Sequence, residues 1–365
     1  MQGVSLPVLY DGRSLSGEPY SGESGTAATV LTHRLPHSAK PHARILPQQG
    51  INMKFHVVVN PAGASGRTGR EWHRIEPVFR ADGISYDVHY SSPTHGIGAI
   101  CAEIEKEENG ALPVNLVICG GDGSLNEAVN GVQHPEHFRF GLIPCGSGND
   151  FARDLGIIGQ PLEKTARTIL EGSVRHVFDI GELEYADDHT VRRFNVSCGI
   201  GFDAAICALA GRSRYKNLLN RIHLGNLIYI SSAFRVIREQ RCLPVTVTAD
   251  GRSYQFDHLL FVCGMNHRFE GGGYQFAPDA DATDGVLNLC LANPAHNADF
   301  YKVFPSVPGG THYEKWPTIM YPIRGREVSV QTSIPLWVHT DGEVARQADH
   351  ILIRVAKEKL AILNS

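Results

Sequence analysis

Short apolar segments alternate with helical segments from residue 53 to about residue 174, and three of the apolar segments end in a glycine-bearing turn. These three apolar runs lie at 55–60, 114–120 and 138–146. Strands that alternate with helices over short connections form parallel sheets, because each parallel strand needs a crossover to return to the same edge. The alternation therefore predicts an α/β domain with a doubly wound parallel sheet.

The pattern of the sequence changes after about residue 175. From there to about residue 350, short segments bounded by turn residues predict strands, with one helical interlude at 203–238. The Ala-Asp-Gly run at 249–251 is typical of a β-hairpin turn. The predicted parts of the chain are a disordered extension at 1–52, an α/β domain at 53–175, a mainly β sandwich domain at 176–350 and a C-terminal segment at 351–365 that could return to the first domain.

Residues 1–52 differ in composition from the rest of the chain. They are rich in glycine, serine, proline and histidine and show little periodicity, which predicts disorder. Met53 begins the first patterned segment. We therefore expect Met53 to be the natural first residue and the preceding residues to come from an over-extended reading frame.

Charge and cysteine content argue against several classes of protein. The formal net charge of −4 argues against a nucleic-acid partner, because nucleic-acid-binding surfaces are usually basic. The cysteines include no CxxC pair, which favours reduced thiols over a disulfide or metal framework. No apolar stretch reaches the ~18–20 residues that a membrane-spanning helix needs. We therefore expect a cytoplasmic protein.

Three glycine-bearing turns follow predicted parallel strands. They are NPAGASGRTG at 60–69, GGDGS at 120–124 and PCGSGND at 144–150. In open α/β sheets, ligands bind beyond the carboxyl ends of the strands. Glycine lets backbone N–H groups approach phosphate oxygens, and the N-terminus of the following helix attracts anions. Three such turns at one edge of a sheet predict a phosphate-binding site.

Other glycine motifs are excluded by single residues. A Walker A loop needs a lysine after its last glycine, but Gly69 is followed by Arg70 and Glu71. The turn after the first strand contains no GxGxxG dinucleotide fingerprint. The CGSGN run is not the GxSxG elbow of a serine hydrolase, because Cys145 and Asn149 occupy its flanking positions.

Asp122 is the unusual residue of the second turn. A carboxylate among phosphate-binding N–H groups would repel a phosphate unless Mg²⁺ lies between them or the carboxylate accepts a proton. The alternative interpretation is that Asp122 caps the helix that begins near Ser124. The sequence leaves both open.

Taken together, VNPAGASGRTG, GGDGSLNEAVNG and IPCGSGNDFARDLGI resemble the diacylglycerol kinase catalytic domain family, in particular its soluble bacterial lipid kinases. Sphingosine kinases are more distantly similar. The resemblance continues through 264–289 and through HTDGE at 339–343. Ser124 and Ser147 replace a threonine that is common in the family, and both keep the hydroxyl.

The resemblance implies a lipid kinase that uses ATP and Mg²⁺, with an NAD-kinase/phosphofructokinase-like first domain and an active site between the two domains. In-line transfer of the γ-phosphate to a lipid hydroxyl would need a proton acceptor, which the resemblance places in the DGE turn at Asp341 or Glu343. Asp122 is the third candidate catalytic residue. The implied nucleotide-binding residues are Asn60, Gly120, Gly121, Asp122, Gly123, Ser124, Asn126, Glu127, Gly146, Ser147 and Asn149.

The acidic segment at 278–287 is a candidate metal site. Carboxylate and backbone oxygens at short spacing suit a hard cation such as Mg²⁺. The resemblance implies a structural Mg²⁺ bound by the Asp281 carbonyl, the Asp284 side chain and the Val286 carbonyl. A solvated acidic loop is the alternative.

A lipid substrate would be reached at a membrane surface, so we expect peripheral membrane contact. Basic residues at 211–241 surround an apolar run and could contact anionic headgroups, or could form a solvated helix face. A homodimer would be in keeping with the family. Two other functions stay open: an NAD kinase-like small-molecule kinase, which shares GGDG but lacks GSGNDFARDLG, and a non-catalytic lipid- or nucleotide-binding regulator.

Overall fold

The computed structural model describes residues 53–81, 83–108, 112–211, 236–237 and 242–364. The extension at 1–52, which the sequence predicts to be disordered, lies outside the described residues. So do the basic side chains of the predicted membrane-contact segment, namely Arg212, Arg214, Lys216, Arg221, Arg235, Arg238 and Arg241. None of the described helices combines the length and the hydropathy that crossing a membrane requires.

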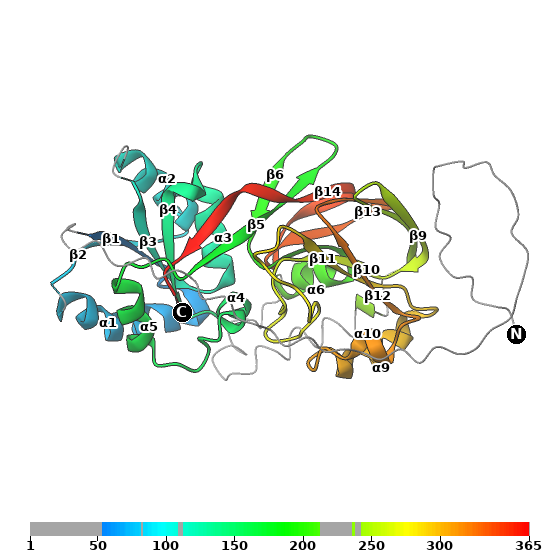
Figure 1. Cartoon of the computed structure of the whole chain (residues 1–365), viewed down its shortest axis with the longest axis horizontal. Helices are drawn as coiled ribbons and strands as arrows, with labels where there is room; N and C mark the ends of the chain where they lie inside the picture. The colour runs from blue at the N-terminus through cyan, green and yellow to red at the C-terminus, as the bar shows by residue number, and fades with distance from the viewer. Residues whose placement is uncertain (1–52, 82, 109–111, 212–235, 238–241, 365) are drawn as a thin grey trace, which may run out of the picture.

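The first domain has a parallel sheet with strand order β2-β1-β3-β4, as the alternation predicts. Figure 1 shows this domain on the left, with helices on both sides of the sheet. Its elements are β1 (Lys54–Val59), α1 (Gly63–Ala81), β2 (Ser85–Tyr90), α2 (Ile97–Glu107), β3 (Val114–Gly120), α3 (Asp122–Gly131), a 3-10 turn (Pro135–His137), β4 (Phe138–Pro144), α4 (Asp150–Asp154) and α5 (Leu162–Leu170).

Successive residues of the central strands enter two different cores. Val57 and Val117 pack on one face with side chains of α1 and α5, including Trp72. Val58 and Leu116 pack on the other face with side chains of α2, α3 and α4. Because both faces are covered, these strands are almost continuously apolar and do not alternate with polar residues.

Two helix boundaries differ from the prediction. Helix α3 begins at Asp122, not near Ser124, because extended Gly121 is its N-terminal cap and Asp122 is favoured in the first turn by the helix dipole. Helix α1 is assigned from Gly63, inside the glycine turn predicted at 60–69, but residues 64–66 have left-handed backbone angles. The regular part of α1 therefore follows these three residues.

The second domain is mainly β and mostly antiparallel, with strand order β12-β11-β10-β7-β13-β14, and β5 and β8 pair with β14 and β13. Its elements are β5 (His176–Tyr185), β6 (Val191–Phe194), β7 (Ser197–Gly201), α6 (Phe202–Gly211), β8 (Leu243–Ala249), β9 (Arg252–Leu259), β10 (Phe261–Met265), β11 (Leu287–Ala292), a 3-10 turn (Asn297–Asp299), α9 (Phe300–Val303), a 3-10 turn (Phe304–Ser306), α10 (His312–Lys315), β12 (Met320–Gly325), β13 (Glu327–Thr340) and β14 (Glu343–Ile362).

Strand β13, at Glu327–Thr340, is longer than the short strands that the sequence predicts for this part of the chain. A register irregularity between Gln331 and Leu336 interrupts its pairing with β14. The hairpin turn predicted at 249–251 connects β8 to β9, and Asp250 and Gly251 have the positive φ angles that such a turn requires.

Strand β14 extends through both domains. It pairs with β13 and β5 in the second domain, and its residues Ala361 and Ile362 pair in parallel with β4 in the first domain. Figure 1 shows β14, in red, running from the β domain to the α/β domain. Beyond the strand, the Asn364 side chain makes two hydrogen bonds of 2.7 Å to the backbone of Leu142. The turn between β13 and β14 is therefore connected directly to the sheet of the first domain.

Candidate active site

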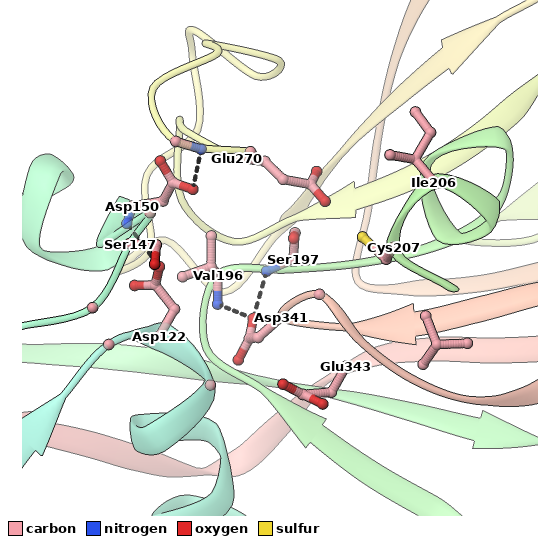
Figure 2. Close-up of a pocket in the computed structure, with 18 of the residues that line it drawn as sticks. Asp122, Ser147, Asp150, Val196, Ser197, Ile206, Cys207, Glu270, Asp341 and Glu343 are labelled. Carbon is pink, nitrogen blue, oxygen red and sulfur yellow. Dashed lines mark hydrogen bonds between the residues drawn. The ribbon is translucent and has the colours of Figure 1, made fainter. Parts of the chain in front are cut away.

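A cleft of about 870 Å³ is lined by residues of both domains. At one end it is lined by the three glycine turns that follow β1, β3 and β4. At the other end it is lined by side chains of the second domain, namely Phe202, Ile206, Phe261, Tyr274, Phe276, Phe300 and Phe304. Figure 2 shows the acidic turn with Asp341 and Glu343 between Asp122 and Ile206. The cleft thus has a polar end, an apolar end and carboxylates between them.

The turns after β3 and β4 contact each other through backbone atoms. A Cβ atom on Gly121 would lie 2.8 Å from the Gly146 Cα, and one on Gly146 would lie 2.4 Å from the Gly121 Cα. The Arg67 guanidinium holds the turn after β4 by donating to the Cys145 carbonyl at 3.0 Å and to the Gly146 carbonyl. Only glycine fits at both positions, so this part of the cleft wall presents backbone and not side chains.

The turn after β1 stores backbone strain. Ala64 and Ser65 have positive φ angles of 47° and 58°, which cost about 1–3 kcal/mol each for residues other than glycine. The Ser65 hydroxyl is buried and has no hydrogen-bond partner in the described part of the chain. Strained backbone and an unpaired buried hydroxyl at the cleft wall are consistent with a polar ligand bound at this turn.

Asp122 caps a helix, but not the helix that the sequence suggests. Its two carboxylate oxygens accept the backbone N–H groups of Asp150, at 2.9 Å, and Phe151, at 3.1 Å, at the start of α4. The alternative interpretation, in which Asp122 caps α3, is therefore wrong. Burial, together with the charge of Asp150, raises the pKa of the Asp122 carboxyl to about 7.

Asp150 is a site residue that the sequence reasoning missed. One of its oxygens accepts the Gly272 N–H at 2.8 Å, and the other is buried without a hydrogen bond, 3.6 Å from the Arg153 Nε. A Cβ atom on Gly148 would lie 3.4 Å from an oxygen of Asp122 and 3.4 Å from an oxygen of Asp150. Its position as the last residue of the third glycine turn was the available signal.

The two carboxylates of Asp122 and Asp150 fit a divalent cation. Burial also raises the pKa of Asp150, so the pair is poorly neutralised by the protein. Carboxylate oxygens are the ligands that Mg²⁺ prefers, and one buried oxygen of Asp150 accepts no hydrogen bond from the described residues and has only the longer 3.6 Å ion pair with Arg153. Magnesium bound here would supply positive charge beside the backbone of the glycine turns.

Both carboxylate oxygens of Asp341 accept hydrogen bonds from other residues of the protein. One oxygen accepts the N–H groups of Val196, at 2.8 Å, and Ser197, at 3.0 Å, as Figure 2 shows. The other accepts the N–H of Asn195 and the side-chain amide of Asn126, both at 2.8 Å. The carboxylate of Asp341 therefore joins α3 of the first domain to the segment between β6 and β7 of the second.

Glu343 has a different environment from Asp341. Its side chain is exposed at the cleft, and one of its oxygens lies 3.1 Å from the place that a Cβ atom on Gly123 would occupy. The part of the chain that the structure describes offers its carboxylate no hydrogen bond. Of the two acids in the turn, Glu343 is therefore the one whose carboxylate is available for chemistry.

The predicted nucleotide-binding residues divide into two groups. Asn126 and Asn149 do not line the cleft: Asn126 bonds to Asp341, and the Asn149 amide donates to the Gly146 carbonyl at 2.9 Å. Both side chains are buried, and their hydrogen bonds hold residues that do line the cleft. The others line the cleft, namely Asn60, Gly120, Gly121, Asp122, Gly123, Ser124, Glu127, Gly146 and Ser147.

The acidic segment predicted to bind a structural Mg²⁺ lies outside the cleft lining. The Asp284 carboxylate pairs with Arg324 and accepts the Val286 N–H at 2.9 Å. The Asp281 carboxylate accepts the Thr283 hydroxyl at 2.7 Å, and its carbonyl accepts the Asp284 N–H at 3.3 Å. These bonds form a compact turn, and the metal site remains a prediction.

We predict that Gly146→Ala abolishes ATP binding, because the added methyl group would push the two glycine turns apart. Overpacking of this kind costs about 1–3 kcal/mol, so most of the protein should stay folded. Calorimetric titration with ATP measures the effect. Gly309→Ala is the control, because its Cβ would lie 4.0 Å from the nearest contact, the Ser306 carbonyl. Equal ATP affinity in both variants would contradict the assignment.

The raised pKa of Asp122 predicts a pH-dependent stability. Between the ordinary value of 3.8 and the folded value of about 7, the folded protein binds more protons than the unfolded chain. The free energy of unfolding should therefore decrease as the pH rises across this range. Asp122→Asn should lose this component, because its side chain does not ionise. Thermal unfolding of both proteins across the range measures it, and parallel profiles would refute the explanation.

The comparisons with known proteins agree with this geometry. Residues 54–183 match the diacylglycerol kinase catalytic domain, and residues 196–364 match the YegS C-terminal NAD kinase beta sandwich-like domain. A diacylglycerol kinase from Bacillus subtilis (strain 168) is 28% identical over 292 residues, which cover 80% of this chain and 89% of that protein.

The chain is also similar to a second relative and, in its fold, to a solved structure. A diacylglycerol kinase from Staphylococcus aureus (strain bovine RF122 / ET3-1) is 25% identical over 295 residues, covering 80% of this chain and 87% of that protein. The crystal structure of a diacylglycerol kinase from Bacillus anthracis str. Sterne has the same fold, with a TM-score of 0.59, 18% identity and coverage of 86% of this chain and 97% of that chain. The chain belongs to the diacylglycerol kinase catalytic domain family, with a YegS C-terminal domain after its catalytic domain.

Proposed function

We propose that this protein transfers the γ-phosphate of ATP to the hydroxyl group of a lipid. The observation that carries the proposal is the cleft with two chemically different ends. Backbone of the glycine turns and the carboxylates of Asp122 and Asp150 line one end, and aromatic side chains line the other. A phosphate donor matches the first environment, and an acyl or isoprenoid chain matches the second.

Glu343 is the proton acceptor that we favour. The lipid hydroxyl must lose a proton as it attacks the phosphate, and an acceptor has to lie between the two substrates. Glu343 lies beside the glycine turn after β3 and is exposed to the cleft, whereas the oxygens of Asp341 already accept four N–H groups. Asp341 would then hold the turn, and Glu343 would take the proton.

The remaining polar groups would hold the donor. N–H groups of the turns at 120–124 and 146–148 would bind phosphate oxygens, with the Ser124 and Ser147 hydroxyls beside them. Asp122 and Asp150 would hold Mg²⁺, which supplies positive charge against the charge that develops on the transferred phosphoryl group. The chain itself forms no covalent bond to phosphate in this mechanism.

The apolar end distinguishes a lipid kinase from the alternatives. An NAD kinase-like enzyme would need polar contacts for the second nucleotide, where this cleft offers phenylalanine side chains. A non-catalytic regulator would have no use for an unengaged carboxylate at Glu343. Diacylglycerol is the first candidate acceptor because it is named in the relatives, while phosphatidylglycerol, sphingoid bases and polyprenols carry the same reactive group. A lipid acceptor also implies contact with a membrane surface.

Incubation with γ-labelled ATP and a panel of acceptors tests the proposal. The panel contains diacylglycerol, phosphatidylglycerol, a sphingoid base and a polyprenol in mixed micelles, and NAD in solution. We expect label in a lipid product, identified by its mass, and none in NAD. Label in NAD alone would favour the small-molecule kinase, and no transfer to any acceptor would favour the regulator.

Glu343→Gln should lower kcat for lipid phosphorylation by about 10²–10⁴-fold, the range typical of losing a general base. Its thermal stability should be unchanged, because no described residue forms a hydrogen bond with the carboxylate. Asp341→Asn should instead lower the free energy of unfolding by about 1–3 kcal/mol, because an amide cannot accept all four N–H groups. Glu327→Gln, at the exposed start of β13, is the control. Full activity of Glu343→Gln would assign the proton acceptor elsewhere.

A further inference from the structure

A cluster of four titratable side chains lies next to the acidic turn and has no role in the proposed reaction. Its members are Asp203 on α6, Cys263 on β10, Glu270 in the loop after β10 and His339 near the end of β13. Asp203 and Glu270 line the cleft, and Figure 2 shows Glu270 projecting toward α6. Cys263 and His339 are each only 1% exposed. The cluster therefore connects the cleft wall with the interior of the second domain.

His339 is the centre of this cluster. Its Nε2 atom lies 2.9 Å from an oxygen of Asp203 and 3.3 Å from an oxygen of Glu270, while the Cys263 thiol donates to the other Glu270 oxygen at 2.9 Å. A Cβ atom on Gly199 would lie 1.8 Å from the Asp203 oxygen and 2.7 Å from Nε2. Any side chain at position 199 would clash with both groups, so the contact between His339 and Asp203 requires a glycine there.

The other nitrogen of His339 contacts the acidic turn. The backbone N–H of Gly342 donates to His339 Nδ1 at 3.2 Å. Because Nδ1 accepts this bond, the proton of the neutral ring lies on Nε2, where it is donated to Asp203. The two carboxylates therefore select the tautomer that leaves Nδ1 free to hold Gly342.

We propose that His339 is a positioning residue that fixes the DGE turn, so that the carboxylate of Glu343 points into the cleft. This inference rests on the proposed function, since His339 acts through Glu343. The turn needs such support because Asp341 and Gly342 have left-handed φ angles of 48° and 80°. Asp341 anchors one side of the turn, and the Nδ1 contact anchors the peptide that immediately precedes Glu343.

A transition-metal site is the competing interpretation of the same four side chains. Nitrogen, oxygen and sulfur donors of this kind can bind zinc or iron. A metal on Nε2 would, however, move the ring proton to Nδ1, opposite the Gly342 N–H. Histidines that bind metals through one nitrogen normally donate the other N–H to an acceptor, and here a donor occupies that place. The geometry therefore favours the hydrogen-bonded network.

The hydrogen bond from the Gly342 N–H to His339 Nδ1 depends on the charge of the His339 ring. Burial disfavours a second proton on the ring, but the hydrogen bond to Asp203 and the charges of Asp203, Glu270 and Asp341 outweigh burial and raise the pKa of His339 from its ordinary value of 6.5 to about 9, so the neutral ring that accepts the Gly342 N–H predominates above that pH. The fourth group that faces the ring, the Cys263 thiol, stays neutral because burial raises its pKa. A proton on Nδ1 would replace the acceptor with a donor, so the contact is lost as the pH falls through the pKa of His339.

Two substitutions separate the roles of the ring nitrogens. In His339→Asn the amide oxygen takes the place of Nδ1 and can accept the Gly342 N–H. In His339→Gln the amide takes the place of Nε2 and can donate to Asp203, but Nδ1 has no substitute. At a pH above the His339 pKa of about 9, we expect His339→Gln to lose kcat by about tenfold to a hundredfold, as a misplaced catalytic group would, with KM for ATP unchanged. His339→Asn should keep a kcat close to that of the wild type.

The dependence of kcat on pH gives a second measurement. A residue that only stabilised the fold would not change this dependence. The kcat of the wild type should decrease as the pH falls through the pKa of His339, and this step should be absent from His339→Asn, whose side chain does not titrate. Equal losses in the two variants, or a larger loss in His339→Asn, would overturn the proposal while leaving the lipid kinase assignment intact.

Nitrogen NMR of the histidine rings tests the inference without any assay of activity. In the wild-type protein, at a pH above the pKa of His339, the proton should lie on Nε2 and Nδ1 should be unprotonated. A proton on Nδ1, or one equivalent of transition metal in the purified protein, would contradict the proposal. This result stands even if no lipid is phosphorylated, so failure of the inference and failure of the proposed function can be told apart.

Discussion

The carboxylate of Asp341 is the contact on which the arrangement of the cleft depends. Its oxygens accept three consecutive backbone N–H groups, at 195–197, and the side-chain amide of Asn126 on α3. A buried carboxylate is costly unless it is fully hydrogen-bonded, and four N–H donors offset that cost here. The bond to Asn126 fixes the distance between α3, which begins at the glycine turn, and the acidic turn of the second domain.

Other contacts hold the same two parts together. The Arg193 guanidinium, on β6, donates to the carbonyls of Val129 and Val132 at the C-terminal end of α3, where the helix dipole favours a positive charge. Strand β14 then extends from the acidic turn into the sheet of the first domain. Because α3 is attached to the second domain at its middle and at its C-terminal end, the phosphate end and the apolar end of the cleft belong to one continuous framework.

The sequence predicts the features that depend on neighbouring residues. The strand–helix alternation predicts the parallel sheet, and three glycine turns at strand ends predict where the polar end of the cleft lies. It does not predict contacts between distant residues. Asn126 and Asp341 are 215 positions apart, and the cap that Asp122 provides to α4 joins residues 28 positions apart. The choice between Asp341 and Glu343 depends on such contacts, as does the role of His339, so neither could be read from local pattern.

In the mechanism that we propose, phosphate passes directly from a nucleotide at the glycine turns to a lipid hydroxyl beside Glu343. Because Asp122 and Asp341 are engaged in hydrogen bonds and Glu343 is assigned to the proton, no group of the chain is assigned to carry the phosphate. The stereochemical course of transfer from ATP made chiral at the γ-phosphorus by oxygen isotopes tests this claim most directly. A single in-line transfer predicts inversion of configuration in the phosphorylated lipid, whereas retention would require a phosphorylated enzyme intermediate and would contradict the account.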